Sequence, residues 1–450
     1  MNDGKYLEHL AAMIRIPTVS TAGYEDQYRM EEFHALLEHL YPTLWKRANV
    51  RKIGKALLLY LKGGWKKPIL FVAHMDVVAA EGNWKYPPFS ATVAEDCIWG
   101  RGSLDMKGAL CALLEGFEEC LDQGFDFDRD IYLNLSCDEE IGGPTTKRIA
   151  RMLRKEQVSF EVVYDEGGTF VDNLLGIVQV RSAAVAIAEK GSARVCLTAH
   201  THGGRAANPP KDTPIARLSD FVHYVEHHQI FKRRVADEIL LMYGKSAPYL
   251  KGINRLLYGN RTFLKRFGRF YLEPSMLGTT IAFTIAKAGT AVNLIPDCAV
   301  ITANVRVNSV ESLKDALRRL KRIAAKMDIE VSCDGDGDAI RVTDIHCEGY
   351  RNLEDCIKTV FGDIPVIPTM LNGGTDSKHY KKMTENIVRF SPIYISPEQG
   401  SGVHGENERL YADQMEQAVA YYRCLLKKYK KGTLSVQYPE LLQTIHPIIC

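Results

Sequence analysis

The sequence has 450 residues, of which 46% are hydrophobic and 25% are charged, so the chain can bury sizeable cores in two or three domains. The formal net charge is only +2, which gives no reason to expect a nucleic-acid or membrane partner. The 11 cysteines form no CxxC pair, which argues against a cysteine zinc finger or a disulfide framework and is typical of free thiols.

The chain begins with a predicted amphipathic helix at 4–15, within a charged segment that lacks the apolar run of a signal peptide. No apolar stretch approaches the roughly 18 residues that a membrane span requires. We therefore expect a cytoplasmic protein.

The following residues alternate predicted helices and strands. Short apolar runs that end in glycine or polar residues predict buried strands at 56–61, 68–73, 131–136 and 160–164. Helical spacing of apolar residues predicts helices at 26–40, 106–120 and 147–155. This alternation predicts an α/β sheet with helices on both faces.

The middle of the chain has a different pattern. Strands are expected within 183–198, within 280–307 and at 329–333, and helices at 214–227 and 310–326. We interpret this part as an α+β domain, 186–335, inserted between the two parts of the α/β domain, 1–185 and 336–450. An expected helical insertion at about 229–275 holds ten Lys or Arg residues against two acidic ones between Lys232 and Arg269. This excess indicates either a solvated basic helix face or a basic rim that steers anionic substrates.

Polar residues stand at the ends of several predicted strands, where sites in α/β sheets form. They are His74 and Asp76, Asp105 within GRGSLDMKG, Glu139 and Glu140, Asp165 and Glu166, and His404 within GVHGENE. Each alone has an ordinary explanation, such as a helix cap or a solvated turn. Carboxylates gathered in one crevice repel one another unless a cation lies among them. Mixed imidazole and carboxylate ligands suit Zn²⁺, and one carboxylate can bridge two metals.

The motifs His-Met-Asp, GRGSLDMKG, DEEIGG, DEGG and GVHGENER occur in this order and together resemble a known enzyme family. It is the dizinc peptidase family of aminoacylase-1, carboxypeptidase S, glutamate carboxypeptidase and succinyl-diaminopimelate desuccinylase, and the likeness runs from about residue 5 to 425. The resemblance implies an α/β dizinc catalytic domain interrupted by an α+β lid that often dimerises. It also implies hydrolysis of a peptide or N-acyl amino acid at an amide bond next to a free carboxylate. Co²⁺ or Mn²⁺ could substitute for the two Zn²⁺ ions.

The resemblance assigns roles to individual residues. The metal ligands would be His74 for one zinc, Asp105 as the bridge, Glu140 and His404 for the second zinc, and either Asp165 or Glu166 to complete the first. The choice between Asp165 and Glu166 stays open. Glu139 would be the general base, and Asp76 would accept the other ring N–H of His74 and fix its tautomer.

Further contacts are implied from the lid and a glycine-bearing loop. His202, with His200 as a competitor, would donate to the developing oxyanion, in most relatives from the partner subunit of a homodimer. The substrate contacts would be Asn293 and Arg306 for the carboxylate, and Gly373, Gly374 and Thr375 in the loop, where Lys378 stands in place of the family's frequent Arg. In a monomer, the basic insertion would instead supply these contacts in cis.

The sequence also bears on three other functional classes. A deacylase or desuccinylase of a biosynthetic amino-acid intermediate would use the same site. A catalytically silent member would lack a metal ligand or the base, whereas both sets are present in the sequence. A nucleotide-binding enzyme would need a GxGxxG turn between a strand and a helix, or a Walker loop, and neither occurs.

Overall fold

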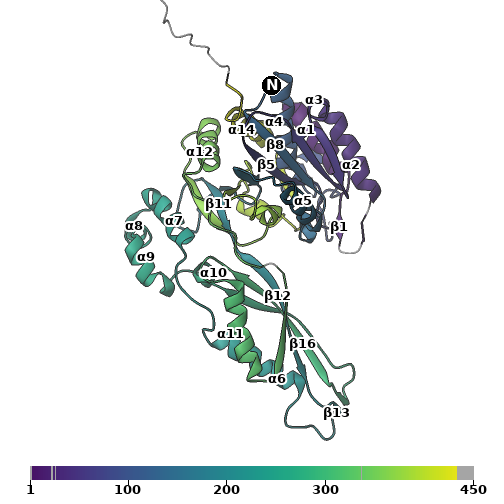
Figure 1. The fold of residues 1–450 in the computed structure, drawn as a ribbon, viewed down its shortest axis with the longest axis vertical. Helices are drawn as coiled ribbons and strands as arrows, with labels where there is room; N and C mark the ends of the chain where they lie inside the picture. The colour runs from purple at the N-terminus through teal and green to yellow at the C-terminus, as the bar shows by residue number, and fades with distance from the viewer. Residues whose placement is uncertain (1–2, 22–23, 26, 336, 433–450) are drawn as a thin grey trace, which may run out of the picture.

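The computed structural model describes residues 3–21, 24–25, 27–335 and 337–432. Figure 1 shows a large sheet with helices around it, from which a second, smaller sheet extends to one end of the molecule. Within the described ranges, no helix has both the length and the apolar composition that crossing a bilayer would demand.

Nine strands form the large sheet in the described part of the chain, in the order β10-β11-β19-β9-β5-β8-β4-β3, with β18 paired to β11. They are β3 Asn49–Ile53, β4 Ala56–Leu61, β5 Lys66–His74, β8 Arg129–Ser136, β9 Val162–Asp165, β10 Thr169–Val171, β11 Ser182–Glu189, β18 Val366–Leu371 and β19 Ile387–Arg389. The central strand β5 runs parallel to β8 and β9, whereas β4 runs antiparallel to β8. The sheet is therefore mixed, and the α/β fold class predicted from the sequence is confirmed.

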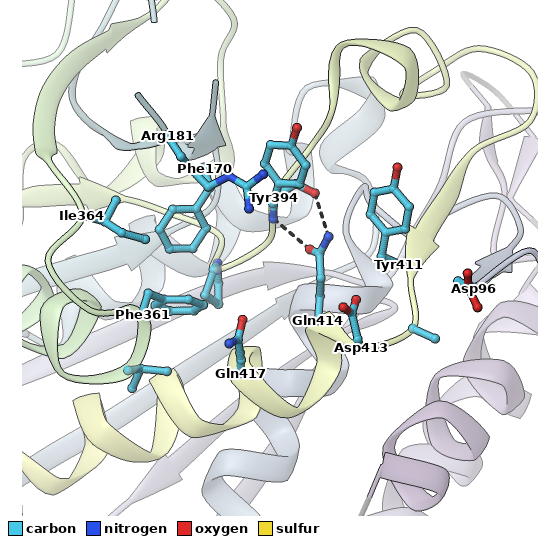
Figure 2. A pocket seen from close by; sticks show the side chains of 13 residues that line it. Asp96, Phe170, Arg181, Phe361, Ile364, Tyr394, Tyr411, Asp413, Gln414 and Gln417 are labelled. Carbon is cyan, nitrogen blue, oxygen red and sulfur yellow. Dashed lines mark hydrogen bonds between the residues drawn. The ribbon is translucent and has the colours of Figure 1, made fainter. Parts of the chain in front are cut away.

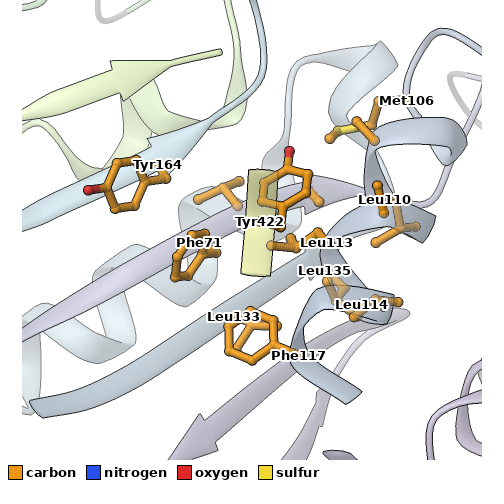
Figure 3. Close-up of a cluster of buried hydrophobic side chains, with 14 of the residues drawn as sticks. Phe71, Met106, Leu110, Leu113, Leu114, Phe117, Leu133, Leu135, Tyr164 and Tyr422 are labelled. Atoms are coloured by element: carbon orange, nitrogen blue, oxygen red, sulfur yellow. The ribbon is translucent and has the colours of Figure 1, made fainter. Parts of the chain in front are cut away.

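Helices cover both faces of this sheet. They are α1 Asp3–Arg15, α2 Gln27–Leu40, α3 Pro42–Arg47, α4 Lys107–Asp122, α5 Pro144–Lys155, α12 Glu348–Phe361 and α14 Gln414–Lys427. In Figure 3, Leu133 and Leu135 of β8 face Leu114 and Phe117 of α4. Successive side chains of a strand alternate in direction. Accordingly Asn134, between the two leucines, donates to Thr146 of α5 at 3.0 Å on the opposite face.

The core between α4 and the sheet is aromatic at its centre. The Phe71 ring packs edge-on against Phe117, with 5.5 Å between ring centroids, and stacks on Tyr164 at 5.1 Å (Figure 3). Burying each of these side chains stabilises the fold by about 2 kcal/mol. This packing fixes β5 and β9, the strands whose carboxyl ends carry candidate site residues.

The smaller sheet has the order β14-β16-β12-β17, and all its pairs are antiparallel. Its strands are β12 Gly191–His200, β14 Thr280–Ala288, β16 Cys298–Val307 and β17 Ile329–Asp334, and helices α6 Pro214–His227 and α11 Leu313–Ala325 pack on it. Phe221 of α6 and Leu320 of α11 belong to a hydrophobic core separate from that of the large sheet. The expected boundary at 185/186 falls inside β11, which pairs with β18 as far as Glu189. A division into domains would therefore come at Lys190.

The expected helical insertion consists of short helices. They are α7 Asp237–Ser246, α8 Gly252–Tyr258, α9 Arg261–Phe267 and α10 Pro274–Leu277. Ile239 and Leu240 of α7 lie in one buried cluster with Leu264 of α9 and Ile367 of β18. The insertion thus packs against the edge of the large sheet.

Candidate active site

Asp105 lies at the centre of the cluster of polar residues expected from the strand ends. Its Oδ1 is 3.0 Å from Nε2 of His74, and its Oδ2 is 3.0 Å from Nε2 of His404. His74 Nε2 is also 3.2 Å from Oε1 of Glu166, and His404 Nε2 is 3.0 Å from Oε2 of Glu140. Two groups of three potential metal ligands therefore share Asp105, as a bridging carboxylate between two metal ions would.

Parallel strands deliver three of the five ligand candidates, together with Glu139, to one end of the large sheet. His74 is the last residue of β5, Glu139 and Glu140 follow β8, and Glu166 follows β9. The other two ligand candidates, Asp105 and His404, come from loops. These loops are brought together by a small antiparallel sheet in which β20 Arg409–Tyr411 pairs with β7 Cys97–Trp99.

Glu408 braces the loop that carries Asp105, a role that the sequence analysis missed. Its fully buried carboxylate accepts hydrogen bonds from the backbone N–H groups of Gly102, Leu104 and Asp105 at 2.9, 2.8 and 3.1 Å. The Arg101 guanidinium donates to the same carboxylate at 2.7 Å. The sequence signal of this contact is an arginine in GRGSLD and an acidic residue in GENER, which can form an ion pair.

Asp76 contacts two parts of the site, the His74 ring and the turn at 139–140. Nδ1 of His74 is 2.9 Å from the backbone carbonyl of Asp76 and 3.6 Å from its carboxylate. With Nε2 turned to the metal candidates, Nδ1–H donates to that carbonyl. The Asp76 carboxylate instead accepts the backbone N–H groups of Glu139 and Glu140, at 3.3 and 3.2 Å, and the Ser20 hydroxyl at 2.6 Å.

Of the two acidic residues at the carboxyl end of β9, only Glu166 reaches the cluster. The Asp165 carboxylate accepts the backbone N–H of Glu166 and that of Ser377, each at 2.9 Å. Asp165 therefore ties the strand end to the segment 372–379, which the sequence analysis associated with substrate. The structure does not bring Asp165 into either ligand group.

The electrostatics of the cluster favour cations. The pKa of Glu139 is raised to about 9, chiefly by burial. The carboxylates of Glu166, Asp376 and Glu140 also raise this pKa, whereas His74 lowers it. Hydrogen bonds to Asp105 and Glu140 raise the pKa of His404 to about 10. Protons thus compensate charge where carboxylates crowd.

Two divalent cations would compensate the charge of these carboxylates in place of the protons. The donor set contains two imidazoles and three carboxylates, which suits Zn²⁺. In addition, Oε1 of Glu140 is buried without a hydrogen-bond partner among the residues that the structure describes. The residues present therefore fit a pair of metal ions.

A cavity of about 670 Å³ opens over this cluster. Glu139, Glu140 and His404 line it together with the predicted substrate residues Arg306 and Gly374. None of its described lining residues comes from the basic insertion at 229–275. The structure therefore does not support a role for that insertion as a basic rim of this cavity.

Other predicted substrate residues lie elsewhere. Thr375 is buried. Its hydroxyl accepts a hydrogen bond from Nε of Arg389 at 3.1 Å and is hydrogen-bonded to the hydroxyl of Ser377, so Thr375 stabilises the segment 372–379 and does not line the cavity. Gly373 is exposed and does not line the cavity. His200 ends β12, and His202 follows it in the link to β13 Gly204–Arg205, which Figure 1 shows at the far end of the smaller sheet.

Asn293 also lies at this far end, because it precedes β15 Leu294–Ile295, the partner of β13. His202 and Asn293 therefore do not join the metal-ligand cluster within one chain.

A second cavity, of about 780 Å³, lies between β10, α12 and the start of α14 (Figure 2). Phe170 and Phe361 line it, and Gln414 is held by hydrogen bonds to the backbone of Tyr394. Its cation, Arg181, already pairs with Asp172 at 3.1 Å. No group of metal-ligand candidates among the described residues lies in this cavity.

Comparisons with known proteins agree with the architecture. A family model described as Peptidase family M20/M25/M40 matches residues 70–428. The N-fatty-acyl-amino acid synthase/hydrolase PM20D1 of Homo sapiens is 30% identical over 431 residues, which cover 92% of this chain and 86% of that protein. The probable carboxypeptidase S-like 2 of Dictyostelium discoideum is 30% identical over 455 residues, or 96% and 86% of the two chains.

The fold is also found among solved structures. The M20 family metallo-carboxypeptidase Sso-CP2 from Sulfolobus solfataricus superposes with a TM-score of 0.72 at 20% identity, over 94% of this chain and 99% of that one. The resemblance drawn from the motifs is confirmed, and this chain belongs to the Peptidase family M20/M25/M40.

Proposed function

We propose that the chain is a dizinc amidohydrolase that cleaves a peptide or an N-acyl amino acid at an amide bond next to a free carboxylate. The observation that carries the proposal is the position of Asp105 between His74 with Glu166 and His404 with Glu140, beside Glu139. Relatives that are carboxypeptidase-like or act on N-fatty-acyl amino acids support the same substrate class.

The ligand residues would be His74, Asp105 and Glu166 for one ion and Asp105, Glu140 and His404 for the other. Bound in this way, a pair of ions supplies an activated water and polarises the scissile carbonyl. Asp105 would keep the two ligand groups in register, since Glu408 fixes its backbone. Asp76 holds the His74 ring through its carbonyl and the 139–140 turn through its carboxylate, so one residue orients ligands on both sides.

Glu139 would act as the general base. It lines the cavity beside the ligand residues, the place that a base for a metal-activated water must occupy. The Glu139 carboxylate takes a proton from water and then passes that proton to the leaving amine. Arg306 and the backbone at Gly374, which also line the cavity, would hold the carboxylate of the substrate.

His202 would complete the site from the partner subunit of a homodimer. Its loop is remote from the cluster of its own chain, so a direct role in catalysis requires a second copy. The edge strand β14 supports this assembly, because it is mostly exposed over nine residues and shows Ile285 to solvent. Exposed apolar edge strands are templates for strand pairing.

The test is a hydrolysis screen of N-acyl amino acids and dipeptides in Zn²⁺, Co²⁺ and Mn²⁺, together with the metal content of the purified protein. We expect two ions per chain and cleavage only of substrates with a free carboxylate. Removal of that carboxylate by amidation should abolish turnover. Equal cleavage of the amidated substrates would overturn the assignment, and so would a protein that binds no metal. The same screen includes acylated biosynthetic intermediates, the alternative substrates of this site.

A further inference from the structure

The cavity over the candidate metal site is basic well beyond what one substrate carboxylate needs. Its basic lining residues are Lys147, Arg151, Arg154, Lys190, Arg306, Lys378, His379, Lys381 and Lys382. The acidic lining residues outside the cluster, Glu189 and Asp338, are already engaged. Glu189 lies 2.8 Å from Arg389, and Asp338 accepts the backbone N–H of Leu313 at 2.8 Å.

Helix α5 contributes one complete face to this lining. Lys147, Arg151 and Arg154 follow one another at spacings of four and three residues, which places them on the same side of a helix. The buried side of α5 consists of apolar residues and Thr146, which pack toward the large sheet. The basic face is therefore directed to the cavity by the same packing that fixes the helix.

Much of this positive charge has no counter-ion in the described part of the chain. Arg151, Arg154 and Lys382 line the cavity without an ion pair to any described carboxylate, whereas Lys378 is near enough to the carboxylates of Glu189 and Asp376 to lower the pKa of each. Lys190 is buried, and its ammonium donates to the backbone carbonyl of Ser275. Burial and the nearby Arg306 lower the pKa of Lys190, against a raising effect of the Glu238 carboxylate.

The apolar part of the lining is small by comparison. It consists of Ala150, Ile340 and Met383. Long acyl chains need an extended apolar wall, because each buried methylene contributes about 0.8 kcal/mol only when it leaves water. This cavity therefore offers little to a long fatty acyl chain and much to an anion.

We propose that the cavity binds a second carboxylate of the substrate, in addition to the one next to the scissile amide. This inference rests on the proposed function and names its substrate class: N-acyl amino acids or peptides with two carboxylates. The second carboxylate belongs either to an acidic side chain of the leaving amino acid or to a dicarboxylic acyl group. Arg151 and Arg154 are the residues that select it.

The experiment compares substrates that differ only in this charge. N-acetylglutamate is paired with N-acetylglutamine for the leaving-group arm, and N-succinyl-leucine with N-butyryl-leucine for the acyl arm. We expect kcat/KM of the charged member to exceed that of the neutral one by about tenfold or more in one arm, the effect of a charge-assisted hydrogen bond. Added salt should lower the ratio of kcat/KM between the charged and the neutral substrate, because salt screens the attraction between the charges. The arm in which the charged substrate is preferred identifies the source of the second carboxylate.

Variants assign the preference to the cavity. The double substitution Arg151→Gln and Arg154→Gln should reduce the ratio toward one while the neutral substrate keeps its kcat/KM. Arg148→Gln is the matched control, because Arg148 is exposed on the same helix and does not line the cavity. Ratios near one in both arms for the wild-type enzyme would overturn the inference, and so would a double variant with an unchanged ratio.

Binding separates this inference from the proposed function. Affinity of the metal-loaded Glu139→Gln protein for N-acetylglutamate, N-acetylglutamine, N-succinyl-leucine and N-butyryl-leucine is measured by calorimetry, with and without the two arginine substitutions. If no substrate is cleaved, tighter binding of a dicarboxylate that depends on Arg151 and Arg154 still supports the basic subsite. Equal binding of the charged and neutral members in both pairs rejects it, whatever the activity.

Discussion

The carboxylate of Glu408 accepts a hydrogen bond from the backbone N–H of Asp105 at 3.1 Å, so a fully buried acid holds the residue shared by the two ligand groups. Glu408→Gln should weaken this brace. The neutral amide cannot compensate the buried Arg101 guanidinium, and breaking a buried pair costs about 3 to 5 kcal/mol. We expect that loss in urea unfolding, together with a lower metal content. Glu406→Gln, an exposed change in the same segment, should alter neither; equal effects of both variants would contradict the role of Glu408.

Glu139 and Glu140 should differ in what their loss removes. Glu139→Gln should keep two metal ions and lose about 100- to 10,000-fold in kcat, because an amide cannot accept the proton. Glu140→Gln should lose metal, because Glu140 belongs to the group with Asp105 and His404. Metal analysis of dialysed protein and initial rates at saturating Zn²⁺ make the comparison. The reverse pattern would mean that the two roles are exchanged.

The adjacent residues Asp165 and Glu166 give a second matched pair. Glu166→Gln should release one ion, since Glu166 lies 3.2 Å from His74 in the first ligand group. Asp165→Asn should keep both ions but destabilise the fold by about 1 to 3 kcal/mol, because Glu166 and Ser377 donate to different oxygens of the carboxylate and an amide keeps only one of them. Loss of metal in Asp165→Asn with full occupancy in Glu166→Gln would show that Asp165 is the ligand.

Local patterns predicted the elements whose partners are close in sequence. The helix 214–227 has the predicted bounds, because Thr213 caps it by accepting from Ala216 and Pro214 stands in its first turn. The strand 56–61 also has its predicted bounds, set by a continuous apolar run. Helix α14 received no prediction. It packs against α1, α4 and α12 at once, so its apolar residues do not form one stripe.

Tertiary neighbours decided what the sequence left open at the site. The motifs marked the candidates that meet around Asp105, because each follows a strand or a glycine-bearing turn. The choice between Asp165 and Glu166 depended on which side of the strand end faces His74, which spacing alone does not reveal. The brace by Glu408 was missed because three of its four partners are backbone N–H groups, which leave no trace in a sequence.

His34 on α2 should make stability depend on pH. Burial lowers the pKa of His34 from 6.5 to about 4, and its Nε2 donates to the carbonyl of Lys55 at 2.9 Å. Its Nδ1 has no hydrogen-bond partner in the described ranges of the chain. The unfolded chain binds the proton first as the pH falls. Stability from this group is therefore complete above pH 6.5 and is lost between pH 6.5 and 4, by about 3 kcal/mol.

The variant His34→Gln isolates this effect. An amide can still donate to Lys55 but does not titrate, so the difference in unfolding free energy between wild type and variant should shrink as the pH falls through that window. Urea unfolding at several pH values measures it. His39→Gln, an exposed change on the same helix, should run parallel to the wild type at every pH. If His34→Gln also runs parallel, His34 is not buried in its neutral form.

The remoteness of His202 from the metal-ligand cluster leads to the last prediction, which concerns subunits. If His202 acts on a neighbouring site, two inactive variants should restore activity when mixed, because each supplies what the other lacks. His202→Ala and Glu139→Gln are mixed in equal amounts under conditions that allow exchange. Random pairing makes half of the dimers mixed, and each mixed dimer has one intact site. Activity should therefore return to roughly a quarter of the wild-type value per chain.

The mass of the protein in solution, from light scattering, is measured alongside. As a control, each variant is mixed with fresh protein of its own kind and should stay inactive. A second control uses Ile285→Lys, which places a charge on the exposed edge strand β14. This change should convert the dimer to a monomer and abolish the recovery, while metal content stays at two ions per chain. If the wild type is monomeric and the mixed variants recover no activity, the dimer is rejected. His202 would then have no part in the reaction, because its loop lies at the far end of the smaller sheet of its own chain.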